Sequence, residues 1–158
     1  MNALIGLGCF GAIAFAYFYL ENTLFLNPCP LCMMQRLAFG LAGLAFLLDA
    51  LLAPRGTVGR WLIRLFKLLS IFFGMGLAAR HLYIQSLPPD QVPACGLDFY
   101  ALMKRNELFS GLWQAMQGDG DCATKDLFWG LSIPLWSMIL FVGLLLLTVL
   151  LVPRKNAH

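Results

Sequence analysis

The stretch LSIPLWSMILFVGLLLLTVLLV, residues 131–152, contains no charged side chain. An α-helix of about 20 apolar residues is long enough to cross the hydrocarbon core of a lipid bilayer. Pro153, Arg154 and Lys155 follow directly and end the apolar run. The stretch therefore predicts a membrane-spanning helix.

Three more runs of this kind precede it, at residues 1–20, 33–53 and 65–87. Their few charged side chains lie near one end or the other, within snorkelling distance of an interface: Arg36, Asp49, Lys67 and Arg80. We expect Asp49 to be solvated there. A cleaved signal peptide is the alternative for the first run, but that run has no basic start and no small-residue cleavage site after Leu20.

The predicted fold class is an all-α membrane protein, a single domain built as a bundle of four transmembrane helices. Its loops are residues 21–32, residues 54–64 and a long loop at 88–130. The composition agrees, because 60% of the residues are hydrophobic and 12% are charged, against about a quarter charged in soluble domains. The net charge is +3, and the basic residues lie beside apolar runs rather than in one block. This distribution argues against a nucleic-acid partner.

Orientation follows from the rule that short loops rich in Lys and Arg stay in the cytoplasm. The connection between the second and third spans and the C-terminal tail are both basic: Arg55, Arg60, Arg64, Lys67, Arg154 and Lys155. The long loop instead carries six acids against three bases between Pro88 and Asp126. We expect both termini in the cytoplasm and every cysteine except Cys9 on the opposite, oxidising side.

Within the long loop, apolar residues recur at roughly helical spacing: Leu97, Tyr100, Ala101, Leu108, Leu112, Trp113 and Met116. This pattern predicts a helix lying flat on the membrane surface. Packing of the same helix inside a compact loop is the alternative. The Gly-Asp-Gly-Asp run at 118–121 predicts a turn that leads to Cys122.

Cys29-Pro30-Leu31-Cys32 lies at the outer end of the second span. Two cysteines three residues apart can close a small disulfide, and the positive end of a helix dipole stabilises a thiolate. Arg36 follows Cys32 by four residues, so on a helix both side chains project from one face within about 6 Å. A positive charge there favours the thiolate further. Snorkelling of Arg36 to lipid phosphates is the alternative.

Cys95 and Cys122 flank the long outer loop, where a disulfide between them could be a structural staple. Two pairs on one side of the membrane instead favour a relay in which one disulfide is exchanged for the other. A zinc site is less favoured, because a second C-x2-C is missing. Cys9 lies in the first span and is assigned no role.

Arg80 and His81 come near the outer end of the third span, at about the depth of Arg36. If the bundle brings these side chains together, they form a polar patch that could hydrogen-bond the carbonyl groups of a quinone ring. A histidine that only fills the interface is the alternative for His81.

The order and spacing of these features resemble the disulfide bond formation protein B (DsbB) family over essentially the whole chain. The specific motifs are Cys29-Pro-Leu-Cys32 with Gln35-Arg36 after it, and Val92-Pro93-Ala94-Cys95-Gly96. The resemblance implies a quinone-dependent thiol oxidase of the bacterial inner membrane, with the two cysteine pairs in the periplasm. Its electron acceptor would be ubiquinone, with menaquinone as the alternative.

The resemblance also implies an order of events. A reduced periplasmic DsbA-like protein of the thioredoxin fold would attack Cys95 and free Cys122, Cys122 would attack Cys29, and the thiolate of Cys32 would meet the quinone beside Arg36. Two rivals remain open. One is a vitamin K epoxide reductase-like bundle, which places its CxxC at the fourth span, whereas here the CxxC comes first. The other is a structural subunit with inert disulfides, which would not explain why Arg36 lies beside a CxxC at the membrane surface.

Overall fold

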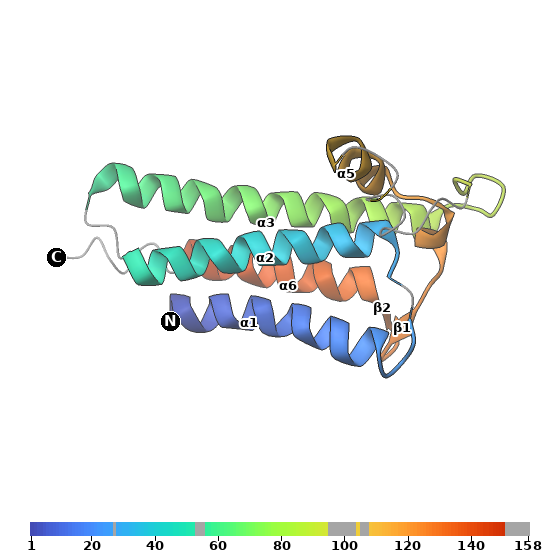
Figure 1. The fold of residues 1–158 in the computed structure, drawn as a ribbon, viewed down its shortest axis with the longest axis horizontal. Coiled ribbons are helices and arrows are strands. Elements are labelled where there is room, and N and C mark those ends of the chain that lie inside the picture. The colour runs from blue at the N-terminus through green and yellow to red at the C-terminus, as the bar shows by residue number, and fades with distance from the viewer. Residues whose placement is uncertain (27, 53–55, 95–103, 105–107, 151–158) are drawn as a thin grey trace.

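The computed structural model describes residues 1–26, 28–52, 56–94, 104 and 108–150. Four long helices lie side by side (Figure 1), and their bounds are α1 at Asn2–Phe15, α2 at Pro30–Leu52, α3 at Thr57–Ser86 and α6 at Ile133–Leu150. A π-helical segment, η1 at Ala16–Glu21, continues α1. With η1 counted as part of α1, all four are long and apolar enough to cross a membrane. The predicted all-α bundle of a multi-pass membrane protein is confirmed.

The starts of three helices differ from the expected spans, and α2 begins at Pro30 rather than at 33. Helix α3 begins at Thr57 rather than at 65, because the basic residues that precede the apolar run are themselves compatible with a helix. Helix α6 begins at Ile133, since residues 131–132 form a strand instead. That strand, β2 at Leu131–Ser132, pairs antiparallel with β1 at Leu127–Phe128 and makes a hairpin before the last span.

Small residues allow the helices to approach one another closely. Gly43 of α2 lies against Cys9 of α1, whose Cβ atom is 3.0 Å from the position that a Cβ on Gly43 would take. Gly74 of α3 faces the ring of Phe141 on α6, and that ring stacks on Phe39 of α2 with centroids 4.1 Å apart. Small residues at crossings are the usual means by which membrane helices pack. Cys9 therefore belongs to the packing of α1 on α2.

We expect Gly74→Ala to destabilise the bundle by about 1–3 kcal/mol, the usual cost of overpacking. A methyl group there would lie 2.2 Å from the Phe141 ring, which is held in place by Phe39. Gly76→Ala is the matched control, because nothing lies within 4 Å of its added Cβ. The measurement is the midpoint of thermal unfolding in detergent. Equal midpoints for the two variants would contradict this packing.

The expectation that Asp49 is solvated is wrong. Its Oδ2 atom accepts hydrogen bonds from Lys67 Nζ at 2.6 Å and from Asn2 Nδ2 at 2.5 Å. Lys67 is buried, with its ammonium group 4.3 Å from the centroid of the Phe46 ring. A buried cation needs a partner, and Asp49 provides it. The network ties α1, α2 and α3 together at the end of the bundle away from Cys29.

The long loop contains helix α5 at Leu108–Gln117 and a 3-10 turn, η2 at Gly120–Ala123. The predicted helix is confirmed over this part, while Leu97, Tyr100 and Ala101 lie outside the described residues. α5 packs on α2 with Ala115 fully buried, and it exposes Phe109 and Trp113 on its other face. Contact of that exposed face with a membrane surface stays a prediction.

Candidate active site

Cys29 and Cys32 lie at the start of α2, at the end of the bundle where the long loop folds back (Figure 1). The prolines at 28 and 30 end the preceding segment and suit a first helical turn. The two Sγ atoms are 3.2 Å apart, and the backbone N–H of Cys32 points to Cys29 Sγ at 3.4 Å. Both residues are free thiols here, in position to close a disulfide.

His81 comes from α3 and is 2% exposed. Its Nε2 atom lies 3.7 Å from Cys29 Sγ, and its Nδ1 atom lies 4.0 Å from Cys32 Sγ. The amide of Gln35 contacts Nδ1 at 3.1 Å. The imidazole therefore lies against both thiols of the CxxC, and Gln35 sets its orientation. Sequence reasoning noted Gln35 only as part of a motif.

Cys122 is fully buried and completes a cluster, because the ligand atoms of Cys29, His81 and Cys122 all lie within 4.8 Å of one another. The expected partner of Cys122 was Cys95, which lies outside the described residues. The pairing with Cys95 stays a prediction, and the structure brings Cys122 close to Cys29 of the CxxC. Asp119 Oδ1 lies 3.6 Å from Cys122 Sγ.

Two contacts hold the loop that carries Cys122. Gly118 has a φ of +73°, in the left-handed region that favours glycine. A Cβ at Gly118 would lie 2.6 Å from Leu31 and 2.7 Å from Ile84, so the loop passes closely over α2 and α3. Beyond the cysteine, the amide of Gln85 donates a hydrogen bond to the carbonyl of Thr124 at 2.9 Å.

Cys29 and Cys122 lie outside the membrane-spanning helices, and their pKa values are shifted in opposite directions. The hydrogen bond from the Cys29 thiol lowers the pKa of Cys122, and backbone hydrogen bonds from Asp119 of the loop and Leu31 of α2 act in the same direction. Hydrogen bonds to Cys122 and Cys32, together with burial, raise the pKa of Cys29. Burial and the neighbouring Asp121 raise the pKa of Asp119. These contacts favour the thiolate form of Cys122 over that of Cys29.

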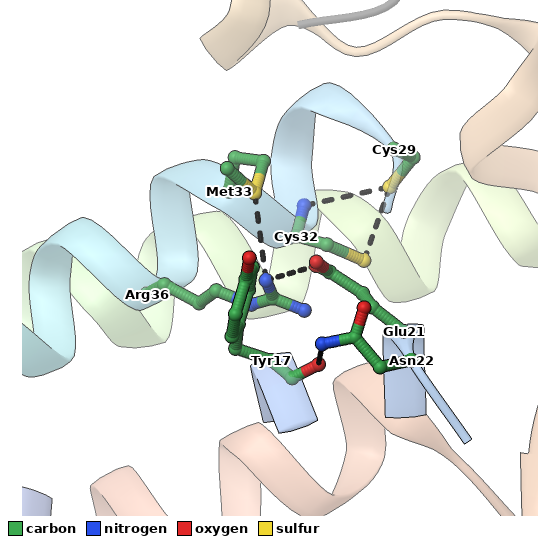
Figure 2. A network of polar contacts seen from close by, with 7 residues as sticks. All are labelled: Tyr17, Glu21, Asn22, Cys29, Cys32, Met33 and Arg36. Atoms are coloured by element: carbon green, nitrogen blue, oxygen red, sulfur yellow. Dashed lines mark hydrogen bonds and ion pairs between the residues drawn. The ribbon is translucent and has the colours of Figure 1, made fainter. Parts of the chain in front are cut away.

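Arg36 lies one turn after Cys32 and forms an ion pair with Glu21 at the end of η1 (Figure 2). Its Nη1 atom also points to Met33 Sδ at 3.6 Å. The pair is largely buried, so Glu21 compensates the charge and holds the guanidinium in place. Sequence reasoning missed Glu21, although an acid directly after the first apolar run was a visible signal.

A cavity of about 270 Å³ opens beside Cys32 and Arg36. Its walls come from α1, η1, α2, the hairpin and α6, and they are mainly apolar and aromatic, with Phe15, Phe128 and Trp136 among them. The side chain of Trp136 is fixed by a hydrogen bond of 2.9 Å to the carbonyl of Phe128. A flat, partly apolar molecule that enters from the lipid could occupy this space.

Arg80 does not join Arg36 and His81 in the expected polar patch. Consecutive residues on an α-helix point about 100° apart, so burial of His81 turns Arg80 outward. Arg80 donates a hydrogen bond of 3.3 Å to the carbonyl of Gln117 in α5 and lies over the Tyr83 ring. His81 contacts the thiols, Arg36 lines the large cavity, and Arg80 lies apart from both.

Comparison with known proteins places the chain in a family. The model of the family described as "Disulfide bond formation protein DsbB" matches residues 1–151. The chain belongs to the DsbB family. Its members are proteins of the bacterial inner membrane, so the chain is a disulfide-forming redox protein of that membrane. This membership sets aside the vitamin K epoxide reductase-like alternative.

Individual DsbB relatives cover nearly the whole chain. A protein named Disulfide bond formation protein B from Xanthomonas campestris pv. campestris (strain 8004) is 43% identical over 141 residues, covering 89% of this chain and 81% of the relative. Proteins of the same name from Hahella chejuensis (44% over 147 residues, 90% and 88%) and Marinobacter nauticus (41% over 155 residues, 96% and 90%) are similar. The family assignment therefore rests on the spans and the loops together.

Proposed function

We propose that this protein is a membrane thiol:quinone oxidoreductase. It reoxidises a periplasmic DsbA-like dithiol protein and passes the electrons to ubiquinone, or to menaquinone in its place. The observation that carries the proposal is the position of Cys122, within 4.8 Å of Cys29 and beside a CxxC whose second cysteine lines the large cavity with Arg36. Purely structural disulfides would not require the thiols of Cys29, Cys32 and Cys122 to lie close together.

The proposed exchange starts with disulfides Cys95–Cys122 and Cys29–Cys32. A partner thiolate attacks Cys95, and Cys122 leaves as a thiolate, which the backbone hydrogen bonds from Asp119 and Leu31 favour. Cys122 then attacks Cys29, which forms Cys29–Cys122 and releases Cys32 as a thiolate. The second thiol of the partner resolves the mixed disulfide, so the partner leaves oxidised and Cys95 is free.

The second half returns the cysteines to their starting state. Cys95 attacks Cys122, which restores the loop disulfide and frees Cys29. Oxidation of Cys29 and Cys32 to a disulfide releases two electrons and two protons, and a quinone takes up both to become a quinol. The net reaction converts one partner dithiol and one quinone into one partner disulfide and one quinol.

The large cavity is the proposed quinone site. Its volume of about 270 Å³ is near the lower end for small-molecule pockets, about 300–1,000 Å³. A quinone ring suits its apolar and aromatic walls, and the tail can extend into lipid. Arg36 is the group that would donate hydrogen bonds to a quinone oxygen next to Cys32, because Glu21 already orients it.

The proposed topology puts this end of the bundle in the periplasm. The N-terminus lies at the opposite end (Figure 1), and α3 begins at that same opposite end with Arg60 and Arg64 in its first turns. The positive-inside rule then assigns that end to the cytoplasm. Cys29, Cys32 and Cys122 would consequently face the oxidising compartment, where disulfides persist.

Trapping the loop-to-membrane disulfide tests the proposal. In a Cys32→Ser, Cys95→Ser double variant, Cys29 and Cys122 have lost their usual partners but still lie within 4.8 Å of each other. Mild oxidation is expected to join them, and peptide mapping under non-reducing conditions should identify the linked peptides. Cys122→Ser added to this double variant is the control that should remove the product. If Cys29 became oxidised while Cys122 remained a free thiol, the proposal would be overturned.

Gln35 is expected to act as a positioning residue. We predict that Gln35→Leu lowers kcat by about tenfold, the worth of a hydrogen bond of about 1.4 kcal/mol, because the His81 ring loses its partner at Nδ1. Gln35 also lines the large cavity, so KM for the quinone is measured together with kcat. Gln35→Glu replaces the donating amide with a carboxylate that can accept from Nδ1–H, and should keep more of the rate than Gln35→Leu. Steady-state kinetics check this. An unchanged kcat for Gln35→Leu would show that the contact has no role in turnover.

A further inference from the structure

Three potential metal ligands meet in the cluster formed by Cys29, His81 and Cys122. All three are buried, and they come from three segments far apart in the sequence. The exchange of disulfides explains why the two thiols are close, but it does not require an imidazole nitrogen aimed at Cys29 Sγ from 3.7 Å. Two thiols and one imidazole form a donor set that Zn²⁺ and related soft ions favour.

The distances suit tetrahedral coordination. Bonds of about 2.3 Å to sulfur and about 2.05 Å to nitrogen place the two donor atoms about 3.6 Å apart at a tetrahedral metal. The observed separation of Cys29 Sγ and His81 Nε2 is 3.7 Å. Two thiolate sulfurs on such an ion lie about 3.8 Å apart, while Cys29 and Cys122 lie within 4.8 Å. A movement of at most about 1 Å would complete the set.

The surroundings also suit an ion. A cavity of about 20 Å³ is lined by Cys29 and His81, enough for one water molecule as a fourth ligand. Gln35 Nε2 lies 3.1 Å from the other ring nitrogen, and a rotation of the amide by about 180° would bring Oε1 there to accept from Nδ1–H of a metal-bound histidine. Two thiolates and a neutral imidazole around a divalent ion carry no net charge, which lowers the cost of burial. Cys32 Sγ lies 4.0 Å from Nδ1 and 3.2 Å from Cys29 Sγ, so it is the neighbouring thiol that a test has to separate from the three ligands.

We propose that the fully reduced protein binds one soft divalent metal ion, Zn²⁺ or Cd²⁺, through Cys29 Sγ, Cys122 Sγ and His81 Nε2. Binding releases the two thiol protons and transfers no electrons. The oxidised protein has no thiolates to offer, so only the reduced form binds. Because both sulfurs would be held by the ion, bound metal arrests disulfide exchange until it is removed. Linear spacing in the sequence disfavoured zinc, but folding brings His81 and Cys122 from two other segments to Cys29.

The test uses the full chain with Cys95→Ser, reduced, free of oxygen and quinone, in lipid nanodiscs. Co²⁺ is the optical probe, and Zn²⁺ then displaces it. We expect one Co²⁺ per chain with thiolate-to-metal absorption. Adding Cys122→Ser or His81→Ala should weaken binding by at least about 100-fold, beyond the loss of an outer-shell partner. Adding Cys32→Ser or Cys9→Ser should leave it nearly unchanged.

Loss of binding in Cys32→Ser with retention in Cys122→Ser would overturn the proposal, because the CxxC alone would then chelate the ion. X-ray absorption of the Zn²⁺-loaded Cys95→Ser chain needs no further variant. It should show two sulfurs at about 2.3 Å with nitrogen and oxygen at about 2.0 Å. A shell without sulfur, or with three or more sulfurs, would also overturn it. These readouts involve no turnover, so their failure is distinct from failure of the proposed function.

Discussion

Replacing Cys29 with serine is expected to abolish quinone reduction by a reduced partner protein, lowering the rate by at least about 1,000-fold, as loss of a nucleophile does. Cys29 is the sulfur that Cys122 reaches from the loop and that Cys32 reaches from α2, at 3.2 Å. No other thiol among the described residues lies between the loop and the cavity. A serine hydroxyl cannot form a disulfide, so the transfer of electrons stops at Cys122.

Cys9→Ser is the matched control for this loss. Cys9 is buried between α1 and α2 and takes no part in the cluster, so the variant should keep its rate. Both variants are assayed with the same reduced partner and a soluble ubiquinone analogue, and circular dichroism checks that each is folded. A Cys29→Ser variant that still turned over at a measurable fraction of the rate would show that the loop cysteines bypass the CxxC.

The second large effect is expected at Arg36. We predict that Arg36→Met raises KM for the quinone by about 10- to 100-fold, because a hydrogen bond from a charged group contributes about 1.5–3 kcal/mol. Arg36 lines the large cavity together with Cys32, and methionine keeps much of its apolar length. Formation of the Cys29–Cys122 disulfide in the double variant should be unaffected, since it precedes the quinone.

Glu21→Gln tests whether Arg36 needs the negative charge of its partner or only a hydrogen-bond acceptor that holds it in place. The glutamine still accepts a hydrogen bond from the guanidinium but removes the ion pair, so we expect a smaller rise in KM than for Arg36→Met. Arg36→Lys should lie between the two, because an ammonium group lacks the planar fork of arginine. Steady-state kinetics over a range of quinone concentrations measure all three. An unchanged KM in Arg36→Met would mean that the arginine only contacts lipid.

Much of the fold could be predicted from sequence, because a membrane span is a local signal. A run such as residues 131–152 contains its own evidence, and the four spans followed from four such runs. The CxxC and Arg36 were also local, since helical periodicity alone places Cys32 and Arg36 on one face. The family match over residues 1–151 agrees with these local features.

The cluster could not be predicted in the same way, because it depends on how separate segments pack. His81 and Cys122 lie 52 and 93 positions after Cys29, and no periodicity relates them. The two ion pairs could not be predicted from the sequence for the same reason. Glu21 received no interpretation and Asp49 was expected to be solvated, yet tertiary packing gives each a cation from another helix. Arg80 was misjudged because burial of His81 decides which neighbour faces outward.

The stoichiometry of electron transfer tests the central claim most directly. Reduced DsbA-like protein is mixed anaerobically with a ubiquinone analogue and a catalytic amount of this protein in nanodiscs, and quinol and partner disulfide are both counted. We predict one quinol per partner disulfide, with no quinol formed by the Cys29→Ser variant. Partner disulfides that accumulate without an equal amount of quinol, or quinol that forms in the Cys29→Ser variant, would contradict the account.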